Sequence, residues 1–213
     1  MTTKLGIAAF AAVLLATSVS ARAAESSWGP GADDAAFEAM LKSGFRDKGI
    51  ARLDRLRQDA TQAFCSDPVK ANAKDQAKAR AEIEAANLAA VKWPSDGVFL
   101  GDFKEGEKVA QSGRGLTSTD KADQVNGGNC YNCHQITKAE ISFGTIGPSL
   151  VGYGRLKGTS EEALRATWSK IWNSKSVNAC SNMPRGGHMG ILTEKQVKDL
   201  MALLLDPNSP VNK

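Results

Sequence analysis

Five consecutive residues, Cys130-Tyr131-Asn132-Cys133-His134, carry the most specific chemistry in this sequence. Two thiols at this spacing can both add to the vinyl groups of a porphyrin, and the adjacent imidazole can then bind the iron from one face. The C-x-x-C-H pattern therefore predicts covalently bound haem c, and it occurs once, so we expect one haem. A zinc half-site would need a second Cys/His pair at ligand spacing, and a thioredoxin-like dithiol would need a βαβ context; the sequence offers neither.

The iron also needs a second axial ligand, and three candidates lie in one Gly-rich loop: Met183, His188 and Met189. We favour Met183, because a thioether is the usual partner of His in soluble electron carriers and raises the reduction potential. Pro184 fixes the backbone directly after Met183. An open sixth position, which would suit ligand binding or peroxidatic chemistry, is the alternative, and it requires that Met183 does not bind the iron.

Residues 1–23 have the features of a secretory signal peptide. Lys4 precedes an apolar run, and Ala21-Arg22-Ala23 matches an A-x-A cleavage signal. The run is shorter than the ~20 apolar residues that cross a bilayer, and no later stretch is long enough either. We therefore expect a periplasmic protein without a membrane span after cleavage.

The charge balance argues against a nucleic-acid partner. Removing Lys4 and Arg22 with the signal peptide lowers the formal net charge from +4 to +2. Two haem propionates would cancel much of the remainder. The sequence also contains no basic run that could neutralise a row of phosphates.

Helical periodicity dominates the chain, which predicts an all-α protein. Residues 24–97 form an Ala-rich, charged extension, for which we predict one amphipathic helix over residues 50–64 and another over 71–91. The breakers in residues 93–97 mark its end, and residues 98–213 form the haem domain. The apolar face of the first helix consists of Ile50, Leu53, Leu56, Ala60 and Phe64.

Three helices are predicted in the haem domain. One begins at about Gly101 and contains Gly106, which could let another helix approach closely. A second follows the cap at residues 159–162, and the third opens at a Thr193-to-Gln196 capping box. Packing of the first helix against the third would close the fold around the haem.

Cys65 and Cys180 remain after the haem has taken the other two thiols. In an oxidising compartment two spare cysteines favour a disulfide. Two separate buried thiols are the alternative. A bond would join the extension to the loop that bears Met183.

The segment Gly147-Pro148-Ser149-Leu150-Val151-Gly152 resembles the G-P-x-L-x-G segment of class I cytochromes c. This resemblance implies a class I cytochrome c-like haem domain. It also implies that the Pro148 carbonyl accepts the second N–H of the proximal imidazole, which orients the ring. Arg155 could reach a haem propionate, or it could be an ordinary solvated arginine.

A wider likeness to a known family is carried by six segments, residues 46–49, 63–66, 128–135, 141–150, 179–185 and 206–212. With these segments, most of the chain after the signal peptide resembles SoxX, the monohaem subunit of the SoxAX cytochromes of bacterial sulfur oxidation. One departure is Gly186, where that family leads us to expect an aromatic residue.

The SoxX resemblance implies a partner and a division of labour. A SoxA-type subunit would carry the catalytic haem, where thiosulfate is oxidatively coupled to a carrier-protein cysteine. This chain would then pass electrons to a small acceptor cytochrome, without a catalytic site of its own.

A free-standing electron shuttle is the rival interpretation. Lys138, Lys157, Lys175 and Arg185 could ring its haem edge with charge. The long N-terminal extension argues against it, because a small shuttle does not need one.

Overall fold

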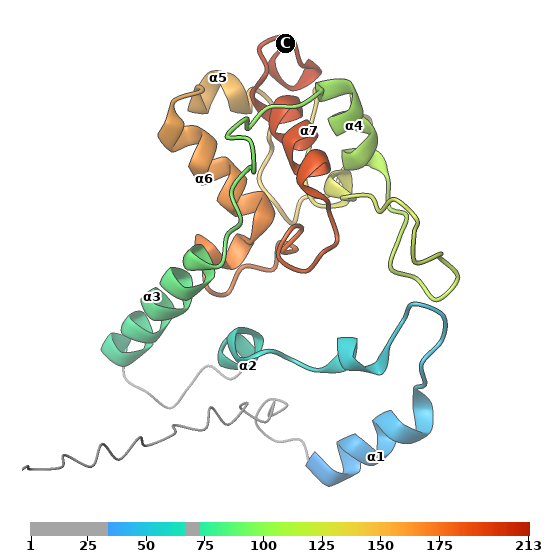
Figure 1. Ribbon diagram of the computed structural model, residues 1–213. Helices are drawn as coiled ribbons and strands as arrows, with labels where there is room; N and C mark the ends of the chain where they lie inside the picture. Colours follow the sequence, from blue (N-terminus) through green and yellow to red (C-terminus); the bar gives the residue numbers. More distant parts are fainter. Residues whose placement is uncertain (1–33, 67–72) are drawn as a thin grey trace, which may run out of the picture.

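Two helices far apart in the sequence pack closely at the centre of the fold, α4 (Phe103–Gln111) and α7 (Glu194–Leu205). Figure 1 shows them side by side near the C-terminus. Gly106 makes this approach possible, because a Cβ at this position would collide with the backbone carbonyl of Asp199. The predicted pairing of the two terminal helices of the haem domain is confirmed.

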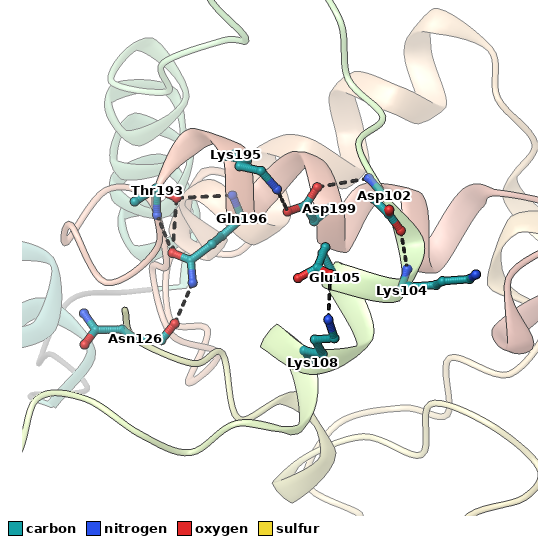
Figure 2. A network of polar contacts seen from close by, with 9 residues as sticks. All are labelled: Asp102, Lys104, Glu105, Lys108, Asn126, Thr193, Lys195, Gln196 and Asp199. Carbon is teal, nitrogen blue, oxygen red and sulfur yellow. Dashed lines mark hydrogen bonds and ion pairs between the residues drawn. The ribbon is translucent and has the colours of Figure 1, made fainter. Parts of the chain in front are cut away.

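Polar contacts fix the register of these two helices (Figure 2). Asp199 is buried, and one of its carboxylate oxygens accepts the Asp102 N–H at 3.0 Å while the other pairs with Lys195 at 2.7 Å. The predicted capping box is present, and the Gln196 side chain also donates to the Asn126 carbonyl at 2.6 Å. Asn126 lies in the loop that leads into the C-x-x-C-H motif, so α7 positions that loop directly.

The aromatic core lies on α6 (Glu161–Trp172), which begins at the Ser160 cap. Trp168 is fully buried and stacks on Trp172, with ring centroids 5.6 Å apart. The edge of Phe99 packs against Trp168. Burial of each large side chain of this kind contributes about 1.5 to 3 kcal/mol. The remaining short helices of this part are η2 (Cys130–Asn132), α5 (Tyr153–Lys157), η3 (Ser174–Ser176) and η4 (Pro210–Asn212).

The computed structural model describes residues 34–66 and 73–213, and these contain helices but no β-strands. This confirms the predicted all-α class. The predicted signal peptide lies outside the described residues. No helix in the described part of the chain combines the length and the apolar composition that crossing a bilayer requires.

The N-terminal extension packs on the haem domain. It contains α1 (Asp34–Gly44), η1 (Leu53–Leu56), α2 (Ala60–Ser66) and α3 (Ala73–Ala89). In Figure 1 α1 and α2 lie below the helices of the haem domain, and α3 reaches up to them. The C-terminal part of α3 contacts the segment after α6, where Asn173 donates to the Asn87 side chain at 2.9 Å.

The single helix predicted over residues 50–64 is wrong, because the chain forms η1, an extended turn and then α2. Arg57 is extended, with φ −88° and ψ 132°. Asp59 accepts the Gln62 N–H at 2.8 Å, and the Gln62 side chain accepts the Asp59 N–H at 2.9 Å. This reciprocal cap begins a new helix at Ala60, and it outweighs the apolar periodicity that suggested continuity.

Gly106→Ala should lower the free energy of unfolding of the holoprotein by about 1 to 3 kcal/mol, because the added methyl group forces α4 away from α7. Denaturant unfolding would measure the loss. Gly44→Ala is the matched control, since a Cβ there meets no atom within 4 Å. Equal stability of the two variants would show that the helices can separate at no cost.

Candidate functional site

The C-x-x-C-H motif is held against the C-terminal end of α4. The Gly128 N–H donates to the Val109 carbonyl at 2.8 Å, and the Asn129 N–H donates to the Ser112 carbonyl at 3.0 Å. Asn129 adopts a left-handed conformation with φ 52°, and the one-turn helix η2 then begins at Cys130. Both motif thiols, Cys130 and Cys133, are free and partly buried.

Desolvation by burial raises the pKa of the Cys130 thiol to about 11. The thiol is therefore protonated at neutral pH, and it does not ionise readily into a thiolate that would attack other groups.

Pro148 orients the His134 ring. His134 Nδ1 donates to the Pro148 carbonyl oxygen at 2.7 Å, which leaves Nε2 as the nitrogen for a metal. Gly147 lies directly against the imidazole, and a Cβ at this position would collide with the ring. The Gly147 N–H also donates to the Cys133 carbonyl at 2.8 Å, so this segment and the motif hold each other.

Met183 lies in a loop that is fixed to the end of α6. Its carbonyl accepts the Ser174 hydroxyl at 2.5 Å, and its N–H donates to Ser181 Oγ at 3.2 Å. The Met183 side chain packs against the same apolar core as Cys130. The motif and the loop predicted to supply the two axial ligands thus meet on one core.

A cavity of about 560 Å³ opens beside the Met183 loop. Met183 and Met189 both line it, whereas His188 is exposed and does not. Its wall is formed by the Met183 loop, by α2 of the extension and by Gln58, which precedes α2. The residues that line the cavity include Gln58, Gln62, Lys175, Met183, Arg185 and Met189.

Two cations are buried in this wall, Lys175 and Arg185. Arg185 Nη1 pairs with Asp59 Oδ2 at 2.6 Å, and Lys175 Nζ donates to the Ala179 carbonyl at 3.0 Å. Desolvation lowers the pKa of Lys175, and repulsion from Arg185 adds to this effect. A free-standing shuttle was suggested to carry four charges around its exposed haem edge. Lys175 and Arg185 are two of these four, and because they are buried they cannot belong to such a ring.

Asp59 was not singled out from the sequence. Burial alone would raise its pKa, but hydrogen bonds from Gln62 and Arg185 outweigh burial, and the pKa lies below its ordinary value. Its carboxylate is therefore charged at neutral pH. The Asp59-x-x-Gln62 spacing was the available signal, since it is typical of a helix start.

The aromatic residue that the SoxX resemblance leads us to expect at Gly186 would fit only if its neighbours moved. A Cβ there would lie 2.9 Å from Leu192 and 3.1 Å from the Ile171 carbonyl oxygen. The Gly186 N–H also donates to the same carbonyl at 3.2 Å. In this chain the backbone itself closes the space between the loop and α6.

Arg155 forms hydrogen bonds with Asn212, near the C-terminal end of the chain. Its guanidinium donates to the Asn212 carbonyl, and its backbone N–H donates to the Asn212 side chain at 3.3 Å. Its contact with a propionate stays a prediction.

Cys65 and Cys180 form a disulfide, which joins α2 to the loop that precedes Met183. The bond closes a sequence separation of 115 residues. All four cysteines of the chain are thus assigned, two in the motif and two in this bond.

The residues present fit a covalently attached haem. The motif offers two free thiols, and His134 presents Nε2 because its other nitrogen is occupied. Gly147 provides space against the ring that no other residue could provide. Elsewhere in the described residues, no group of three or more His, Cys, Asp or Glu side chains could hold a metal ion.

Comparison with known proteins gives the same class. Residues 103–206 match the family model for cytochrome c. The chain is also 38% identical, over 159 residues, to an uncharacterized lipoprotein of Aquifex aeolicus (strain VF5), and the match covers 73% of each chain. Residues 103–206 are therefore a cytochrome c domain, and this domain makes the protein a c-type cytochrome, an electron-transfer haem protein.

Thiol labelling of the denatured, unreduced holoprotein should find no free cysteine, because the haem and the disulfide consume all four thiols. Cys65→Ser is the control, since it should release one thiol at Cys180. On the chain-entropy model, a loop of this length stabilises the fold by about 4 to 5 kcal/mol, so reduction should lower the unfolding midpoint. Labelling of both Cys65 and Cys180 in the wild-type protein would contradict the bond.

Proposed function

We propose that this chain is an exported monohaem cytochrome c in which Cys130 and Cys133 bind the haem, and His134 and Met183 are the axial ligands. The observation that carries the proposal is the hydrogen bond from His134 to Pro148, because it fixes the tautomer of the ring and leaves Nε2 as the nitrogen that can bind the iron. The family assignment supports bound haem c, and the lipoprotein relative is consistent with export.

When bound, haem c supplies an iron that alternates between the ferric and ferrous states and so carries one electron. The chain's own residues set the conditions for this exchange. Pro148 keeps the His134 ring in one tautomer, and Met183 would donate a thioether, which favours the ferrous state. The backbone contacts of the Met183 loop limit its motion, so little reorganisation accompanies each transfer.

Met183→Ala should keep the covalent haem but lose the weak far-red absorption band that marks a methionine–iron bond in the ferric protein. The reduction potential should fall, because a thioether ligand raises it. Met189→Ala is the matched control, since Met189 lines the same cavity. The assignment fails if Met189→Ala loses the band while Met183→Ala retains it.

We further propose that the protein is the electron-accepting subunit of a SoxAX-type complex. In this proposal the chain has three parts, a signal peptide (residues 1–23), the extension (residues 24–97) and the haem domain (residues 98–213). The SoxX-like segments support this proposal. So does the extension, which packs on the haem domain through α3 and the disulfide and thereby enlarges the surface beside the Met183 loop. Catalysis would reside in the SoxA-type partner, and a small soluble cytochrome would receive the electrons.

Co-expression with a SoxA-type cytochrome should yield a heterodimer that elutes earlier than this chain alone in size-exclusion chromatography. A stable interface would bury more than ~1,200 Å² in total. If the two proteins elute separately at micromolar concentration, the complex is wrong and the free-standing shuttle is favoured.

A further inference from the structure

The Met183 loop is held from two opposite sides. On one side the haem domain supports it through Ser174 and through the Gly186 N–H. On the other side lies a segment that we call the strap, residues 47–66, which runs from Asp47 to the end of α2. The Arg55 side chain donates to the Leu116 carbonyl at 2.6 Å, and Cys65 is bonded to Cys180, so the strap is attached to the haem domain near its middle and near its C-terminal end.

Between these attachments, one side chain of the strap reaches the loop by an ion pair. Asp59 uses Oδ1 to accept the Gln62 N–H and Oδ2 to pair with Arg185 at 2.6 Å. The Arg185 side chain is only 8% exposed, whereas that of Asp59 is 42% exposed. A buried guanidinium requires a partner, because an unpaired charge in the protein interior is costly.

Arg185 follows Met183 by two residues, with the rigid Pro184 between them. The Arg185 carbonyl accepts the Met189 N–H at 3.0 Å, and this bond closes the next turn of the loop. Any shift of the Arg185 backbone would therefore act on the loop within two residues of Met183. The other charged or titratable groups near the pair are Lys175 and His188.

We propose that Asp59 is a positioning residue for the axial methionine, and that it acts through Arg185 to keep the Met183 loop closed on the iron. This inference rests on the proposed function, in which Met183 binds the iron. The strap contains none of the proposed haem-binding residues, yet it would hold the Met183 ligand in place. It would then serve electron transfer as well as stability.

Imidazole titration of the ferric holoprotein tests the inference, because added imidazole binds the iron only when Met183 has left it. The apparent affinity for imidazole therefore measures the fraction of molecules with an open loop. Asp59→Asn keeps an oxygen that can cap α2 and removes only the charge that pairs with Arg185. We expect the imidazole affinity to rise about tenfold, equivalent to about 1.4 kcal/mol of loop opening.

Asp47→Asn is the matched control on the same strap. Asp47 also accepts one backbone N–H, from Leu53 at 2.7 Å, and also pairs with one arginine, Arg52, at 2.9 Å. The structure shows no contact of this pair with the Met183 loop, so the imidazole affinity should stay within about twofold of the wild-type value. Asp59→Ser is a second variant that keeps the helix cap and removes the carboxylate. Asp59→Glu keeps a carboxylate, so its imidazole affinity should lie between those of the wild-type protein and Asp59→Asn.

Equal imidazole affinities for the Asp59 and Asp47 variants would overturn the inference and leave the methionine ligand intact. The same holds if both variants lose stability in denaturant and neither opens the loop. A wild-type ferric protein without the far-red band would overturn the proposed ligand and the inference together.

Discussion

The close contact between α4 and α7 is the interaction on which the rest of the molecule depends. Gly106 removes the side chain that would separate the helices, and Asp199 then ties the start of α4 to α7 by accepting the Asp102 N–H. The same pair of helices also fixes the haem-binding motif, since α4 accepts hydrogen bonds from Gly128 and Asn129 while Gln196 holds Asn126. A change in the spacing of these helices would therefore also move the segment that carries the motif thiols.

Most of the features that individual residues predicted have local causes. The motif thiols and the Thr193 capping box each need only neighbouring residues, whereas the role of Pro148 came from the resemblance to class I cytochromes c. The helix expected over residues 71–91 corresponds to α3 (Ala73–Ala89), and the helix expected after the capping box corresponds to α7 (Glu194–Leu205). The break at Arg57 was missed because apolar periodicity continues through it, although the hydrogen bonds between Asp59 and Gln62 begin a new helix after it.

The pairing of Asp59 with Arg185 could not have been predicted in this way. Many acidic and basic side chains are present, and nothing in their spacing selects this pair. Only the fold brings the strap to the Met183 loop, and only burial of Arg185 makes the pair consequential. A buried ion pair is weak evidence for stability, because desolvation offsets much of the attraction. Such a pair does define one geometry well, which is what a ligand-bearing loop requires.

The disulfide has a consequence for how the protein is made. In the exported protein that we propose, Cys65 would leave the export channel before the motif cysteines and Cys180 would leave it last, so an oxidising compartment would offer Cys65 the wrong partners first. Four free thiols can pair in several ways, and a bond from Cys65 to Cys130 or Cys133 would block the porphyrin. Covalent haem attachment removes both motif thiols from this competition and leaves Cys180 as the remaining partner. In this chain, the cofactor would act as a protecting group that decides which cysteines oxidise together, and its timely delivery would limit the yield of correctly bonded protein.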